Sequence, residues 1–288
     1  MKRRYRGLGE RLLLYEEVLR LRQKGLGYKR ISKTLGEIYG VRVNSGVIYN
    51  WISGRHNPLG RCNKIIQSPE LAYVIGGWLG DGTLAVDRRN CKHHVILRVK
   101  DFDFATEWGR CLATAFGVKK PYRPVWDKVN RRWGVKASSI LLYMILSRAK
   151  KNPWITLPYL EEYPAEALQG LFDAEGNVDG AFYHIRLRNA EMQLLKLARH
   201  LLRKLDIDSK IYTWKQQLYV KDLKSGKIYR RKQDVAYCLV ISRRENIVKF
   251  AKKVGFRIRR KQEALEDLLQ KYKSTLIHRL NFRILREY

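Results

Sequence analysis

The chain has 288 residues, of which 59 are Lys or Arg and 27 are Asp or Glu, so its formal net charge is +32. Its hydrophobic content of 45% argues against a disordered basic tail, and its length suggests about two domains. So large a surplus of positive charge indicates that the protein binds a polyanion, and it argues against a soluble protein that is basic without such a partner. No run of about 18 apolar residues is present and the N-terminus lacks the apolar centre of a signal peptide, so we expect a cytoplasmic protein without a membrane partner.

Residues 1–60 have the pattern of a small all-helical module, followed by a linker at 57–69. An apolar stripe predicts a first helix, the break at 25–27 separates a short second helix, and 44–45 can cap a third. Two short helices joined by a turn are typical of a helix-turn-helix, a unit that reads duplex DNA. The third helix would present four residues to bases or phosphates: Ser45, Tyr49, Asn50 and Arg55. The alternative is a three-helix unit that contacts protein.

Two later segments, 69–82 and 164–176, share one layout. Each begins with Pro, continues as an apolar helix and ends with a carboxylate just before Gly, and these are start and stop signals of a helix. Small residues four apart lie on one face of each helix: Gly76 with Gly80, and Gly170 with Ala174. We therefore expect the helices to pack backbone to backbone, with Asp81 beside Glu175 at one end.

Two acids at that end would repel each other and the negative ends of both helix dipoles. A divalent metal ion with oxygen ligands would remove this repulsion. The alternative is a pair of buried amphipathic helices with incidental acids. The repeated layout favours the metal site over that alternative.

Each motif is followed by a similar succession of elements. Alternation predicts strands at 95–100, 118–125 and 133–137, and then at 184–188, 210–212, 218–220 and 237–241. A hairpin at 224–227 would join 218–220 to 237–241. Helices are expected at 104–116, 140–149, 194–205, 245–254 and 262–272.

The predicted strands are aliphatic on one face and basic on the other, as a sheet lying over duplex nucleic acid requires. Acids are scarce on the basic face. The residues expected to contact DNA from the strands are Arg98, Arg132, Lys136, His184, Arg186, Arg188, Lys215, Gln217, Tyr219 and Lys221.

Four isolated cysteines predict neither a zinc site nor a disulfide framework: Cys62, Cys91, Cys111 and Cys238.

The stretches 74–82 and 168–176 resemble the two motif copies of a single-chain LAGLIDADG homing endonuclease, and the resemblance covers about residues 68–272. It implies an α+β fold of two pseudo-symmetric αββαββα halves, 61–160 and 161–288, with paired central helices, basic antiparallel sheets and an accessory helix-turn-helix at 1–60. It also implies a monomer that binds a long double-stranded DNA site and makes a staggered double-strand break with Mg²⁺. Carried over by position, Asp81 and Glu175 are catalytic and bind metal, and Gly80 and Ala174 belong to the metal-binding set.

Lys100 matches the position at which many members of that family carry a basic residue near the active site, where it would offset phosphate charge. In the second half Asn189 falls opposite Lys100, so that half departs from the family pattern. Because of this departure, it is an open question whether the two DNA strands are cut equally. The neighbouring Arg188 is a candidate to replace the missing lysine. Asp173 lies short of the functional position and is expected to be structural.

Two other functions fit the same scaffold. One is a splicing cofactor whose basic saddle binds structured intron RNA. The other is a DNA-binding regulator whose helix-turn-helix is the working part and whose LAGLIDADG domain is catalytically silent. The presence of both acids at an unfavourable helix end argues against a catalytically silent domain. Metal-dependent nicking of DNA would separate the endonuclease from both alternatives.

Overall fold

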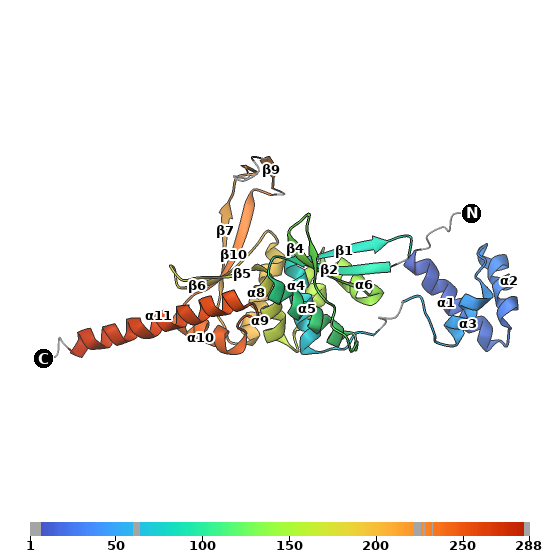
Figure 1. The fold of residues 1–288 in the computed structure, drawn as a ribbon, viewed down its shortest axis with the longest axis horizontal. Helices are drawn as coiled ribbons and strands as arrows, with labels where there is room; N and C mark the ends of the chain where they lie inside the picture. The colour runs from blue at the N-terminus through green and yellow to red at the C-terminus, as the bar shows by residue number, and fades with distance from the viewer. Residues whose placement is uncertain are drawn as a thin grey trace. The chain divides into compact units, whose positions relative to one another are not determined.

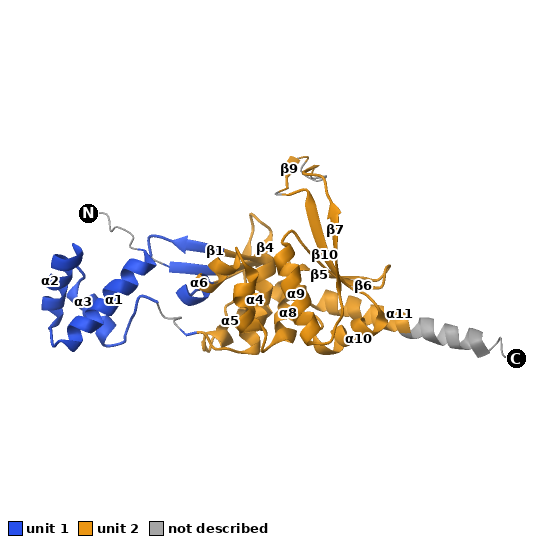
Figure 2. Cartoon of the chain, turned by 180° about the vertical axis from the view of Figure 1, so that it is seen from behind, with its two compact units in different colours: residues 1–64, 84–95, 137–143 blue, residues 65–83, 96–136, 144–288 orange. Residues whose placement is uncertain are grey.

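The computed structural model describes residues 7–59, 64–90, 92–221, 226, 228–231 and 233–284, with side chains up to residue 272. Most of its helices and strands are labelled in Figure 1. Most of the predicted hairpin at 224–227, as well as Cys62 and Cys91, lies outside the described residues. The chain divides into two compact units, one comprising Met1–Lys64, Leu84–Val95 and Ala137–Tyr143 and the other the remaining residues (Figure 2). The domain boundaries expected near residues 60 and 160 stay predictions.

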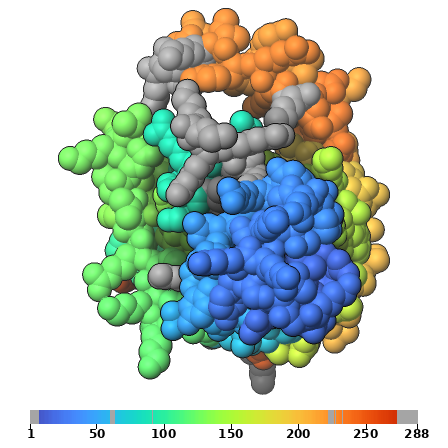
Figure 3. All heavy atoms as spheres, turned by 90° about the vertical axis from the view of Figure 1, so that its right-hand side faces the viewer, coloured from blue at the N-terminus to red at the C-terminus, as the bar shows by residue number. Residues whose placement is uncertain are grey.

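Three helices near the N-terminus pack around a core of their own, seen as blue spheres in Figure 3. They are α1 (Leu8–Gln23), α2 (Tyr28–Tyr39) and α3 (Ser45–Ile52), and they bury a shared aliphatic cluster together with Trp51. Gly40 ends α2 with a φ of 62°, a left-handed conformation that glycine adopts without steric cost. The Asn44 side chain caps α3 by accepting a hydrogen bond from the Gly46 amide at 2.8 Å. The three helices expected here are confirmed.

The rest of the chain contains two copies of one order of elements. The first copy is α4 (Pro69–Asp81), β1 (Gly82–Asp87), β2 (Lys92–Val99), α5 (Phe102–Ala115), β3 (Val125–Asp127), β4 (Arg132–Ser138) and α6 (Ile140–Ala149). The second is α8 (Pro164–Glu175), β5 (Gly176–Asp179), β6 (His184–Asn189), α9 (Met192–Lys204), β7 (Lys210–Lys215), β10 (Val235–Ile241) and α10 (Arg244–Lys253). The short helices η1 (Pro153–Thr156) and α7 (Leu157–Leu160) join the copies, and α11 (Arg259–Ile284) follows the second.

Each copy builds a four-stranded sheet, in the order β1-β2-β4-β3 and β5-β6-β10-β7. The pairings of β5, β6, β10 and β7 are antiparallel, as is that of β3 with β4. The α+β fold with two αββαββα halves is therefore confirmed.

The strand predictions are wrong in two places. Residues 118–124 form no strand, because β3 begins only at Val125 and the Tyr122 amide instead donates a hydrogen bond to the carbonyl of Gly109. Residues 218–220 do not pair with 237–241, because β8 (Tyr219–Lys221) pairs with β9 (Ile228–Arg230) in a separate two-stranded ribbon. Alternation predicts a strand but not its partner, and the place beside β10 belongs to β7, whose Ile211 lies opposite the buried Leu239.

The helices α4 and α8 approach each other backbone to backbone. A Cβ atom added at Gly76 would lie 2.0 Å from the carbonyl oxygen of Ala167, and one added at Gly170 would lie 2.2 Å from that of Tyr73. Only glycine fits at these two positions without a shift of the backbone. The close packing expected from the small residues is confirmed.

Gly76→Ala is expected to lower the free energy of unfolding by about 1–3 kcal/mol or more, because the new methyl group forces α4 and α8 apart. Gly36→Ala is the matched control, since Gly36 also lies inside a helix but has open space around it. That control is expected to raise stability by about 0.5–1 kcal/mol. Denaturant unfolding of both variants measures the two effects, and equal effects would contradict the close packing of the helices.

Candidate active site

Asp81 and Glu175 are the last residues of α4 and α8. The crossing of the helices brings these ends together, since a Cβ atom added at Gly80 would lie 2.9 Å from Cγ of Glu175. Both side chains are half-buried. Burial raises the pKa of Asp81, and burial together with the charge of Asp81 raises the pKa of Glu175 to about 7. The structure thus brings together the two acids that the sequence singled out.

A buried lysine that the sequence analysis missed lies beside these acids. Lys261 of α11 is only 5% exposed, and its Nζ donates hydrogen bonds to the carbonyl oxygens of Phe172 (3.0 Å) and Asp173 (2.6 Å). These carbonyls belong to the end of α8, where the Phe172 carbonyl also accepts from the Gly176 amide and the Asp173 carbonyl lies among the last four of the helix. The charge of Lys261 lowers the pKa of both Asp81 and Glu175, while burial lowers the pKa of Lys261 itself to about 8.

The position of Lys261 had no distinguishing signal in the sequence. It closes the run Arg257-Ile258-Arg259-Arg260-Lys261, in which every residue but one is basic. Arg259 and Arg260 of this run are largely exposed and pair with Glu263 and Asp101. Only the register of α11 against α8 distinguishes the buried lysine from these neighbours.

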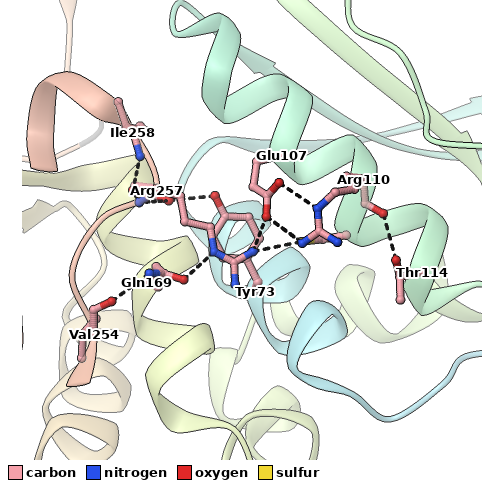
Figure 4. Close-up of polar contacts among 10 residues, drawn as sticks. Tyr73, Glu107, Arg110, Thr114, Gln169, Val254, Arg257 and Ile258 are labelled. Carbon is pink, nitrogen blue, oxygen red and sulfur yellow. Dashed lines mark hydrogen bonds and ion pairs between the residues drawn. The ribbon is translucent and has the colours of Figure 1, made fainter. Parts of the chain in front are cut away.

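A buried polar network attaches this segment to the motif helices (Figure 4). The hydroxyl of Tyr73 donates to Asp173 at 2.7 Å, and the main-chain amide of Arg257 donates to the same carboxylate at 3.1 Å. The Arg257 guanidinium lies over the Tyr73 ring, 4.2 Å from its centroid, and donates to Gln169 and to Glu107, each at 2.5 Å. Burial raises the pKa of Asp173 to about 6. The network fixes the start of α11, and so the position of Lys261.

The two halves surround the acids unequally. The side-chain amide of Asn189 donates to Glu175 Oε1 at 3.2 Å. Lys100, its counterpart in the first half, is exposed at the bend after β2. The hydrogen bond from Arg260 at 2.9 Å lowers the pKa of Asp101, and the adjacent Lys100 makes the smallest contribution to that lowering. Arg132, predicted as a DNA contact, lies near enough to Asp81 to lower the pKa of that acid.

The residues predicted to contact DNA from the sheets do not all share one face. Arg98, Lys136 and Arg188 are exposed, and Arg98 donates to the Thr83 hydroxyl at 3.3 Å. His184 is half-buried, and Arg186, also half-buried, is paired with Asp179 at 2.7 Å. Lys215 instead projects on the side of the sheet that buries Leu239, since alternate residues of β7 point the same way.

The remaining predicted contacts lie off these sheets. Gln217 follows β7, while Tyr219 and Lys221 belong to the β8–β9 ribbon, and all three are exposed. In α3, Tyr49 is exposed, packs edge-on against Tyr28 at 5.6 Å and lies beneath Arg55 at 5.2 Å. Ser45 and Asn50 are half-buried on the same helix. Their roles in DNA binding stay predictions.

The donor set fits a hard divalent cation such as Mg²⁺, which prefers carboxylate and carbonyl oxygens. Across the described residues no three His, Cys, Asp or Glu side chains converge on one point. The two carboxylates would therefore be the side-chain ligands, with the predicted main-chain oxygens of Gly80 and Ala174 beside them. In the same described part of the chain Cys111 and Cys238 are free thiols, and no helix is long and apolar enough to cross a membrane.

Glu175→Gln is expected to remove a pH dependence of stability. Because the pKa of Glu175 rises from 4.5 to about 7 on folding, folding favours its protonated form. That stabilisation is complete below pH 4.5 and is lost as the pH rises through 7, on the order of 3 kcal/mol in all. Denaturant unfolding at pH 4.5 and pH 8 should show this loss in the wild type and in an exposed control, Glu16→Gln. An equal loss in Glu175→Gln would contradict the raised pKa.

Comparison with known proteins gives a family match within the second half. Residues 162–255 match the family model of the LAGLIDADG-like domain. Over 264 residues the chain is 33% identical to the uncharacterized protein MJ0398 of Methanocaldococcus jannaschii, and the alignment covers 91% of this chain and 94% of that protein. The chain belongs to the same family as MJ0398.

Two solved structures are also similar to the chain. The homing endonuclease I-DmoI, in a complex with DNA and Mn, is 20% identical, covers 66% of this chain and 97% of its own, and gives a TM-score of 0.46. Full-length DUF199/WhiA from Thermatoga maritima is 17% identical, covers 78% of this chain and 70% of its own, and gives a TM-score of 0.44. The resemblance noted in the sequence spans both motifs, whereas the family match covers the second.

Proposed function

We propose that this chain is a monomeric endonuclease that makes a staggered double-strand break in a long DNA target by Mg²⁺-dependent phosphodiester hydrolysis. The observation that carries the proposal is the meeting of Asp81 and Glu175 at the adjoining C-terminal ends of α4 and α8. Two ionised carboxylates at the negative ends of two helices are unfavourable unless cations neutralise them. Their presence in both motif copies therefore supports a metal site.

Each group near the acids has a part in this proposal. Asp81 and Glu175 would hold Mg²⁺, which supplies Lewis acidity at the phosphate and lowers the pKa of an attacking water. Lys261 places a positive charge beside the acids below its pKa of about 8, and Asn189 orients the Glu175 carboxylate through its hydrogen bond. Lys100 would offset phosphate charge from the edge of the site.

DNA binding is assigned to two surfaces. The exposed arginines and lysines of the sheets would neutralise the phosphate backbone, so affinity should fall steeply with salt. Helix α3 would read base edges in a groove with Tyr49 and Asn50, and Arg55 would contact the backbone. The ribbon residues Tyr219 and Lys221 would extend the contact beyond the second sheet.

One observation favours a second candidate, a DNA-binding regulator without nuclease activity. Lys261 already places a cation at the end of α8, which reduces the need for a metal there. A protein of this kind would bind DNA through the same surfaces and would not cut it.

The test is cleavage of DNA by the full chain. Duplexes that the protein binds are first selected from a randomised library in EDTA. The recovered duplexes are then incubated with the protein in Mg²⁺ and, separately, in EDTA. The endonuclease is supported by cuts of defined position on both strands in Mg²⁺ alone. Tight binding with intact DNA in Mg²⁺ would favour the regulator.

A further inference from the structure

The basic face of the second sheet carries two large aromatic rings that sequence alternation did not single out. Tyr212 and Trp214 lie on β7 and are 52% and 40% exposed (Figure 1 shows this strand beside β10). In the register of the sheet Tyr212 lies opposite Cys238, and Cys238 lies opposite Arg188. Side chains of directly paired residues point to the same face, so both rings share the face of Arg188.

Small side chains separate the rings from the arginine. Trp214 lies opposite Ala236, and Cys238 is 5% exposed. Arg188 is hydrogen-bonded to the buried Cys238 thiol, so its side chain reaches toward the rings. The exposed apolar part of this face consists of Tyr212, Trp214 and Ala236, bordered by a cation.

The charge of the face and its two exposed rings restrict what can lie on it. An arginine border on a chain of net charge +32 favours a polyanion. The apolar group that a DNA duplex offers to such a surface is the C5-methyl group of thymine, which projects into the major groove. Uracil lacks this methyl group, and the major groove of an RNA helix is too deep and narrow for side chains to read.

We infer that Tyr212 and Trp214 recognise thymine methyl groups in the major groove, and so restrict the second sheet to thymine-containing DNA. This inference rests on the DNA-binding part of the proposed function. It adds a base-specific contact to a face whose arginines are proposed to neutralise phosphates. It also separates DNA from RNA as the ligand of this sheet.

The test replaces thymine by deoxyuracil, one position at a time, in the selected duplex. Binding is measured in EDTA, so that the result does not depend on cleavage. At least one replacement in the half-site protected by the second sheet is expected to weaken binding about 4-fold, which corresponds to about 0.8 kcal/mol for one buried methyl group. In Tyr212→Ala or Trp214→Ala the thymine and deoxyuracil duplexes should bind equally.

Trp126→Ala is the matched control. Trp126 is 41% exposed, about as much as Trp214, but it pairs with Trp133 on the side of the first sheet that faces away from Arg132. This variant should keep the full preference for thymine. The inference is overturned if no thymine in that half-site is sensitive, if both aromatic variants keep the wild-type ratio, or if only RNA is bound. Thymine sensitivity without any cleavage in Mg²⁺ would instead overturn the nuclease and leave the inference intact.

Discussion

Asp81→Asn is expected to slow DNA cleavage by on the order of 10³-fold or more while changing the affinity for uncut DNA by less than about 3-fold. The substitution preserves the size of the side chain but removes one of the two carboxylates that would hold Mg²⁺. A metal acting as a Lewis acid contributes several kcal/mol to the transition state, and each 1.36 kcal/mol is about tenfold in rate. Glu175→Gln should have an effect of the same size, because the two acids end equivalent helices.

The measurement pairs single-turnover cleavage with a gel shift on the same duplex. Asp267→Asn is the control, because it removes the same charge from an exposed position on α11. It should cut at the wild-type rate. Unchanged cutting by both acid variants would show that the reaction takes place elsewhere on the protein.

Lys261→Met is expected to lower the free energy of unfolding by about 2–3 kcal/mol at pH 8. The substitution removes the lysine donor from the Asp173 carbonyl, removes one of two donors from the Phe172 carbonyl, and removes a cation that lowers the pKa of both acids. The loss should be smaller at pH 5, where Glu175, with a pKa of about 7, is already protonated in the folded protein. Lysine is charged in both the folded and the unfolded protein at pH 5, whereas at pH 8 about half of Lys261 is neutral in the folded protein, which adds only about 0.4 kcal/mol to the difference.

Thermal or denaturant unfolding with and without Mg²⁺ tests this expectation. The variant should recover part of its stability at pH 8 when Mg²⁺ is added, because the metal replaces the missing positive charge. The control Lys252→Met makes the same change at an exposed position on α10 and should have little effect at either pH. Equal losses at pH 5 and pH 8 would mean that Lys261 does not act on the acids.

The pairing of the motif helices was predictable because it depends on local chemistry. Proline, a helical run of apolar residues and a carboxylate before glycine set the bounds of each helix, and glycines four apart dictate which faces meet. Asp81 and Glu175 follow from these rules without any knowledge of the rest of the fold. The strand faces of Arg98, Arg132 and Arg188 follow in the same way from a period of two.

The parts that the sequence did not predict depend on contacts between distant elements. Lys261 lies in the same basic stretch of sequence as its exposed neighbours. Only the network of Asp173 and Arg257 places it against the C-terminal end of α8. Lys215 has the right period but belongs to the other face, because the register of β7 is set by its pairing with β10. Tyr212 and Trp214 were overlooked because aromatic residues are common on buried strand faces.

The order of Glu175 and Lys261 along the chain has a consequence for synthesis. Both acids leave the ribosome before the lysine does, since Lys261 follows them in sequence. A nascent chain that has completed α8 therefore displays two carboxylates with Arg132 as a cation acting on Asp81, but without Lys261. The site reaches its final electrostatic state only when α11 has emerged from the ribosome and packed against α8. Any activity therefore begins only after this step of folding.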